Sequence, residues 1–134
     1  MSKQECGIAS NKCNDKEKNV KVSNIIPFIP SKDYQISKDF YEALGFKGEY
    51  ASDDLTLFEN NGCRFFLQRF YNRELADNLV FQLAVLSIDD AWRTISNLSG
   101  FNIKFEPVKQ ERWGKVIFLW GPSGELWQVT EFNH

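Results

Sequence analysis

Histidine is almost missing from this 134-residue sequence, which contains a single one, His134. Side chains at chain ends commonly fray, so we expect no imidazole inside the fold. Ser-His-Asp and Cys-His enzymes need such an imidazole as their base. The composition therefore argues against both kinds of nucleophilic enzyme, and any metal ion would have to be bound by carboxylates, amides or a thiolate.

Cysteine is scarce as well, with three residues, Cys6, Cys13 and Cys63. They form no C-x-x-C pair and no second cluster that could complete a zinc site, so we expect neither structural zinc nor a disulfide framework. We interpret Cys63 as a small buried residue. The sequence also lacks the apolar run of a secretory signal, and we therefore expect a cytoplasmic protein.

Long hydrophobic runs and an excess of basic charge are absent too. No window approaches the roughly 20 apolar residues of a membrane-spanning helix. The formal net charge is −2, from 16 Lys and Arg against 18 Asp and Glu, whereas proteins that bind nucleic acid or anionic lipid usually carry a basic patch. Neither a nucleic acid nor a membrane is expected as a partner.

Aromatic residues, by contrast, are abundant: they make up 15% of the chain, with twelve Phe, four Trp and four Tyr. Residues 1–21 contain few large apolar groups and carry five Lys against three acidic residues, which is typical of a mobile tail. Residues 22–134 are long enough for one compact core and too short for two ordinary domains. We therefore predict a tail followed by a single domain.

The first half of this domain predicts a strand, a helix and three more strands. Asp33 is a typical residue to begin the helix and Gly45 a typical residue to end it. Pro27 cannot donate a hydrogen bond to a sheet, so the first strand belongs at an edge or a crossover. The predicted elements are a strand over residues 22–30, a helix over 33–45 and strands over 47–52, 54–60 and 63–71.

The second half repeats this order after a polar loop at residues 71–78. A strand over residues 79–87 precedes a helix from Asp89 to Gly100, and three further strand candidates follow. The matching order and spacing favour an internal duplication. We therefore predict an α+β fold of two paired βαβββ modules, about 22–71 and 79–134, that form a curved mixed sheet.

Three segments of the chain resemble the vicinal oxygen chelate superfamily, which includes glyoxalase I and the bleomycin resistance proteins. They are FYEALGF at residues 40–46, DDLTLF at 53–58 and RWGKVIFLWGPSGELWQVT at 112–130. The bleomycin resistance proteins are the most similar branch, since they share a proline in the first strand, the acidic pair and the Trp-Gly pair. The resemblance covers about residues 24–132. It implies the paired-module fold and a homodimer with clefts between two chains, in which first strands could be exchanged at Pro27.

Metal-dependent members of this superfamily hold their ion with His, Glu or Gln residues on the first and last strand of each module. Motif register places uncharged residues at these positions here: Ile26, Phe66 or Gln68, Leu83 or Gln82, and Gln128. One or two neutral amides do not repay the desolvation of a divalent ion. We therefore expect no metal, no other cofactor and no metal-dependent chemistry.

The segment at residues 49–59 contains four acidic residues and no basic one, which favours a cationic partner. In the bleomycin resistance proteins the equivalent region borders a cleft that holds a cationic, planar drug, and the resemblance places Tyr50, Asp54 and Trp113 at that cleft. A polar amide on an apolar strand must find a hydrogen-bond partner, which makes Gln82 and Gln128 candidates as well. The predicted ligand-binding residues are Tyr50, Asp54, Phe66, Gln82, Trp113 and Gln128.

Structural roles compete with these assignments. An acidic run between strands is more often a solvated hairpin than a binding site, and aromatic strand residues are more often core than ligand wall. Trp113 fits either role, and the sequence does not fix which sheet face Trp120 and Trp127 occupy. Trp92 is expected to pack its predicted helix against the sheet.

The sequence is therefore compatible with three functions. The favoured hypothesis is a metal-free, bleomycin resistance-like protein of antibiotic resistance that sequesters a small planar or cationic compound, unchanged, in an aromatic cleft at a dimer interface. The alternative is a metal-dependent lyase or dioxygenase of the superfamily with atypical ligands, such as Gln68, Gln128 or a residue of a partner chain. A structural module that only assembles larger complexes is the third. Whether the chain is an enzyme stays undecided, with the balance toward a binding protein.

Overall fold

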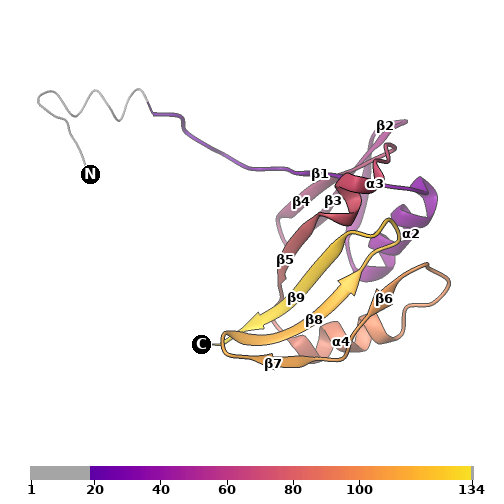
Figure 1. The fold of residues 1–134 in the computed structure, drawn as a ribbon. Coiled ribbons are helices and arrows are strands. Elements are labelled where there is room, and N and C mark those ends of the chain that lie inside the picture. The colour runs from indigo at the N-terminus through magenta and orange to yellow at the C-terminus, as the bar shows by residue number, and fades with distance from the viewer. Residues whose placement is uncertain (1–18, 134) are drawn as a thin grey trace, which may run out of the picture.

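A computed structural model describes residues 19–133 of the chain (Figure 1). Residues 1–18 of the predicted tail, and His134, lie outside the described residues. The helices are α2 (Tyr34–Leu44), α3 (Arg73–Asp77) and α4 (Ile88–Ser96). The strands are β1 (Phe28–Pro30), β2 (Lys47–Ser52), β3 (Leu55–Asn60), β4 (Cys63–Gln68), β5 (Val80–Ala84), β6 (Lys104–Phe105), β7 (Lys109–Glu111), β8 (Gly114–Trp120) and β9 (Leu126–Phe132). Within the described range, each helix falls short of the length and apolar character needed to cross a membrane.

The strands form two sheets with the same internal plan. The first sheet has the order β1-β4-β3-β2, and the second has the order β5-β9-β8-β6, with β7 also paired to β8. In each sheet the first strand of the module runs parallel to the last one, and the remaining pairs are antiparallel. The predicted α+β class and the repeated βαβββ order are thus confirmed. One detail differs, because β6 and β7 together take the place that β2 holds in the first module.

Local sequence signals explain where the two long helices begin. The Asp33 carboxylate accepts a hydrogen bond from the Ile36 N–H at 3.1 Å, and Gly45 ends α2 with a φ of 121°, as predicted. The predicted start of the second helix at Asp89 is wrong by one residue, because the Ser87 hydroxyl caps α4 by accepting from the Asp90 N–H at 3.2 Å. That helix also ends at Ser96, before Gly100.

Two further predicted boundaries differ from the structure. The expected polar loop at residues 71–78 contains helix α3, which Asn72 caps by accepting from the Leu75 N–H at 2.9 Å. Only residues 28–30 of the expected first strand pair with a neighbour. Residues 19–25 instead run away from the body of the fold in Figure 1, and the exposed side chains of Val22 and Ile25 lie on this arm, whereas the Pro27 carbonyl still accepts a hydrogen bond from the Phe66 N–H at 2.9 Å.

The core lies between the two modules, where one face of each sheet is buried. The Tyr41 ring of α2 lies 4.9 Å from the Phe65 ring of the first sheet and 5.9 Å from the Trp127 ring of the second, measured between centroids. Phe65 and Trp127 themselves are 5.8 Å apart. We call the opposite face of each sheet its outer face, because it is turned away from this shared core.

Candidate functional site

The outer face of the second sheet carries two of the predicted residues side by side. In the strand register Gln82 of β5 is aligned with Gln128 of β9, and Gln128 is aligned with Phe118 of β8. Since side chains alternate along a strand, Trp120 lies on this face and Trp127 lies in the core. The structure thus settles the orientation that the sequence left open for these two tryptophans.

The two amides differ in how their hydrogen-bonding groups are used. The Gln82 Nε2–H donates to the Gln128 carbonyl at 3.1 Å and to the Thr130 hydroxyl. The Gln128 side chain is half-buried and makes no hydrogen bond within residues 19–133. An amide that is withdrawn from water without a partner costs about 1–3 kcal/mol. A bound ligand could supply the missing partner.

Aromatic rings and lysines lie next to these amides. The Phe118 and Trp120 rings, both half-buried, have centroids 6.2 Å apart at an interplanar angle of 81°. The Lys104 ammonium lies 4.7 Å from the Trp120 ring centroid and the Lys109 ammonium 4.8 Å from that of Phe118. Neither Phe118 nor Trp120 is among the ligand contacts predicted from the sequence, because their two-residue spacing indicates only that they share a face of one strand, while the strand register shows that Gln128 lies on that face.

Phe66 lies on the outer face of the other sheet. It is aligned with Phe28 of β1 and with Leu57 of β3, and its ring centroid is 4.9 Å from that of Phe28. Because each outer face is turned away from the shared core, a single chain does not bring Phe66 together with Gln82 and Gln128.

Tyr50 and Asp54 occupy the β2–β3 hairpin. Tyr50 is aligned with the buried Thr56, so it lies on the face opposite Phe66, and the register shifts between Tyr50 and Ser52. The Tyr50 hydroxyl donates to the Asp53 carboxylate at 2.7 Å, and this hydrogen bond raises the pKa of Tyr50. Asp54 is exposed and forms an ion pair with Arg69 at 3.4 Å. This pairing offsets part of the acidic charge that suggested a cationic partner.

Trp113 lies in the turn between β7 and β8 and is 51% exposed. Its carbonyl accepts a hydrogen bond from the Asn133 N–H at 2.9 Å. The following residue, Gly114, is aligned with Phe132. Trp113 therefore lies at one end of the second sheet, beyond the strand positions that carry Phe118 and Gln128.

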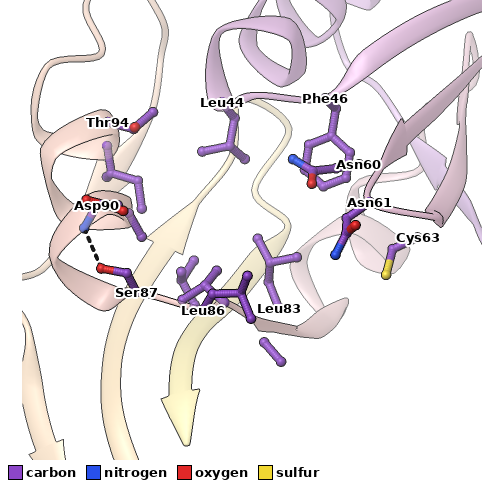
Figure 2. Close-up of a pocket in the computed structure, with 15 residues that line it drawn as sticks. Leu44, Phe46, Asn60, Asn61, Cys63, Leu83, Leu86, Ser87, Asp90 and Thr94 are labelled. Atoms are coloured by element: carbon purple, nitrogen blue, oxygen red, sulfur yellow. Dashed lines mark hydrogen bonds between the residues drawn. The ribbon is translucent and has the colours of Figure 1, made fainter.

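A separate cavity of about 510 Å³ lies between the two modules (Figure 2). Leu44 and Phe46 come from the first module, while Leu83 and one side of α4, from Asp90 to Ile95, come from the second. None of the six predicted ligand-binding residues lines it. Cys63 is exposed at its edge, so the expected burial of this thiol is wrong.

The four positions that hold a metal ion in relatives do not fit one here. Ile26 precedes β1, and the donors that the other positions offer are the neutral amides of Gln68, Gln82 and Gln128. Within residues 19–133 no group of three or more His, Cys, Asp or Glu side chains could hold an ion. A divalent cation prefers carboxylate or imidazole ligands, which offset the free-energy cost of removing its water. This donor set supplies neither.

Comparison with known proteins agrees with the duplicated architecture. A profile of the Glyoxalase/Bleomycin resistance protein/Dioxygenase superfamily matches residues 23–129. The chain belongs to this superfamily. No curated protein is similar enough in sequence to count as a match.

Solved structures with the same fold include several antibiotic-related proteins. A bleomycin-binding protein from Streptomyces verticillus, solved with copper(II)-bleomycin, superposes with a TM-score of 0.71 at 18% identity, covering 86% of this chain and 100% of its own. TnmS3, an antibiotic-binding protein from Streptomyces sp. CB03234, gives a TM-score of 0.72 at 15% identity, with coverages of 86% and 100%. The fosfomycin resistance protein FosX from Listeria monocytogenes gives 0.68 at 13% identity, with coverages of 84% and 94%. At these identities the likeness is one of fold.

Proposed function

We propose that this protein binds and sequesters a small planar compound on the outer faces of its sheets, without altering it chemically. The main support for this proposal is the arrangement of side chains around Gln128. Among residues 19–133, the half-buried Gln128 amide has no hydrogen-bond partner and lies beside the Phe118 and Trp120 rings, and no group of carboxylate or imidazole side chains there could hold a metal ion. Rings hold planar ligands by stacking, and polar groups among them fix the orientation.

The relatives support a binding role. Two proteins with this fold bind antibiotics, namely the bleomycin-binding protein and TnmS3. The sequence allowed a planar or a cationic ligand, and a planar ligand has the stronger support. The prediction of a cationic ligand rested on the acidic segment at residues 49–59. In that segment Asp54 is already paired with Arg69, and Tyr50 faces away from Phe66.

We further propose that the complete cleft forms between two chains. Phe28 and Phe132 are large apolar residues that remain 48% and 42% exposed, one in each sheet. A partner could place the outer face of its first sheet, with Phe66, over the outer face of the second sheet, with Gln128. The extended arm at residues 19–25 is suited to first-strand exchange, because it leads into Pro27, which lacks a backbone donor and so leaves one position of the strand unpaired on that side.

The dimer is tested by the mass of the protein in solution. Sedimentation equilibrium at micromolar concentration is expected to give twice the chain mass. Phe28→Asp, which places a charge on the outer face of the first sheet, is expected to shift the protein toward the monomer. A wild-type protein that is strictly monomeric at these concentrations contradicts the shared cleft.

Binding is tested by titrating the protein with a panel of planar aromatic compounds while following tryptophan fluorescence and melting temperature. Binding to the folded state alone raises the melting temperature with ligand excess. Gln128→Leu and Phe118→Ala are expected to weaken binding. Ala91→Leu, which changes a residue in the cavity of Figure 2, serves as the matched control and should not weaken it.

Mass spectrometry of the recovered compound checks that it is unchanged. Chemical conversion of the compound over repeated turnovers supports the enzyme alternative instead. So does a stoichiometric amount of zinc, nickel, manganese or iron in protein purified without chelators.

A further inference from the structure

The charge next to the Trp120 and Phe118 rings comes from two lysines on β6 and β7, the two short strands that pair with β8. Lys104 of β6 is aligned with Trp120, and Lys109 of β7 is aligned with Val116, so both side chains lie on the outer face of the second sheet. Their ammonium groups approach the ring centroids to 4.7 Å and 4.8 Å. The positions at which a ligand cation would meet these rings are therefore already next to protein cations.

The two lysines differ in how their charge is balanced. Lys109 forms an ion pair with Glu106 at 3.2 Å. In the part of the chain that the structure describes, no carboxylate lies within ion-pair distance of Lys104. Lys104 thus holds a positive charge over the face of the Trp120 ring, without an ion-pair partner among residues 19–133.

This charge decides between classes of planar ligand. A cationic ring that stacks near Trp120 meets the like charge of Lys104, which opposes binding. An aromatic ring that carries a carboxylate gains a charge-assisted hydrogen bond from the same ammonium group. The Gln128 amide N–H, which lacks a partner in the described part of the chain, can donate to a polar substituent elsewhere on the ring.

We propose that the ligand of this face is a planar aromatic carboxylate, whose ring packs on Phe118 and Trp120 and whose carboxylate is bound by Lys104. This inference rests on the proposed function, since it assigns a ligand class to the same surface. It reverses the sign of charge that the acidic segment at residues 49–59 suggested.

The experiment compares three probes that share a naphthalene ring and differ in charge. They are 2-naphthoate, 2-naphthamide and 2-naphthylmethylammonium, titrated by calorimetry into the full-length protein at low ionic strength. We expect 2-naphthoate to bind about tenfold more tightly than 2-naphthamide, as one charge-assisted hydrogen bond permits, and the ammonium probe to bind most weakly. Added salt should reduce the difference between the probes.

A variant then links this preference to one side chain. Lys104→Met keeps the apolar stem but removes the charge, and it should lower 2-naphthoate affinity about tenfold to that of 2-naphthamide, whose own affinity should stay the same. Lys104→Arg should retain most of the preference. Lys115→Met is the matched control on β8, because Lys115 is aligned with Glu131 and lies on the opposite face of the sheet.

The outcomes separate this inference from the function on which it rests. If all three probes bind equally, or if the ammonium probe binds best, the anionic ligand class is wrong while the planar binding site stands. If 2-naphthoate binds best but Lys104→Met, with an unchanged unfolding midpoint, keeps the preference, the role of Lys104 is overturned. If none of the probes binds to the folded protein, the binding surface and its ligand class fail together.

Discussion

Tyr41 and Glu125 are 84 positions apart in the sequence, and their side chains are joined by a hydrogen bond of 2.6 Å across the boundary between the two modules. The Tyr41 hydroxyl donates to one carboxylate oxygen and accepts from the Trp127 indole N–H at 3.0 Å. The Ser123 backbone N–H donates to the other oxygen at 2.9 Å. Both Tyr41 and Glu125 are fully buried. This small polar network therefore fixes how α2 of the first module sits against the β8–β9 turn of the second.

Removal of the Tyr41 hydroxyl should destabilise the fold. Tyr41→Phe leaves the Trp127 N–H without an acceptor and the buried Glu125 carboxylate with one donor fewer, and such buried unsatisfied groups cost about 1–3 kcal/mol each. Urea unfolding followed by tryptophan fluorescence gives the change in the free energy of unfolding. Tyr50→Phe is the matched control, because the Tyr50 hydroxyl is exposed and, among residues 19–133, hydrogen-bonds only to Asp53, and its effect should stay within about 0.5 kcal/mol. Equal effects of the two substitutions would count against the network.

Glu125 should give the stability of the protein a specific pH dependence. Burial raises the pKa of Glu125 above its ordinary value of 4.5, although the hydrogen bonds from Tyr41 and Ser123 lower it. The folded chain therefore binds this proton more tightly than the unfolded chain. The resulting contribution to stability is complete below pH 4.5 and is lost as the pH rises through the raised folded-state pKa.

The measurement is the difference in free energy of unfolding between the wild type and Glu125→Gln, from urea titrations between about pH 4 and pH 8. Glutamine cannot ionise, so the wild type should lose stability relative to the variant as the pH rises, whereas the difference should be level at the acidic end. A difference that stays constant over the whole range contradicts a raised pKa.

Local signals made the module plan predictable. Asp33, Gly45 and the alternation of the strands mark the elements within a few residues, and their repetition along the chain revealed the duplication. Trp92 also packs as expected, against Phe105 of β6, with ring centroids 5.6 Å apart. Each of these features depends on residues close together in sequence or on a simple period.

Features that depend on distant partners could not be predicted. Glu125 follows the GPSG turn, where a glutamate would be expected to lie exposed. No residue near it in the sequence indicates that the Tyr41 hydroxyl donates a hydrogen bond to it inside the core. The face of Tyr50 depends on a register shift between Tyr50 and Ser52, which no local residue pattern announced. The resemblance implies a cleft formed between two chains, and a single chain accordingly carries Phe66 on one sheet and Gln82 with Gln128 on the other; how two chains would meet is not written in any local pattern.

Gly114 should tolerate no side chain. A Cβ atom at this position would lie 2.3 Å from the Glu131 carbonyl oxygen, which is backbone and cannot swing aside. Gly114→Ala is therefore expected to separate the ends of β8 and β9 and to destabilise the protein by about 1–3 kcal/mol in urea unfolding. Gly62→Ala is the comparison, since Gly62 has a φ of +84° but open space around its Cα. A larger cost at Gly62 than at Gly114 would show that backbone strain, not the clash, governs these turns.

Partial filling of the intermodule cavity should stabilise the fold. Ala91 of α4 lines the cavity together with the apolar side chains of Leu44 and Leu83 (Figure 2), and leucine is a good helix former. Ala91→Leu should raise the free energy of unfolding by about 0.5–2 kcal/mol, measured by urea titration. Ala91→Ser adds a polar atom of similar size to a methyl group and should not stabilise. A lower stability of Ala91→Leu would mean that the cavity is too constricted to accept the added methyl groups.

The binding surface is tested most directly by a two-dimensional NMR titration of the ¹⁵N-labelled protein with 2-naphthoate, read at the indole and side-chain amide signals. We expect shifts of the Trp120 indole and the Gln128 side-chain amide, with little change at Trp92 on α4 and Trp127 in the core. Shifts confined to the cavity residues Asn60 and Asn61, with Trp120 and Gln128 unmoved, would place the ligand between the modules and contradict a binding surface of rings and amides.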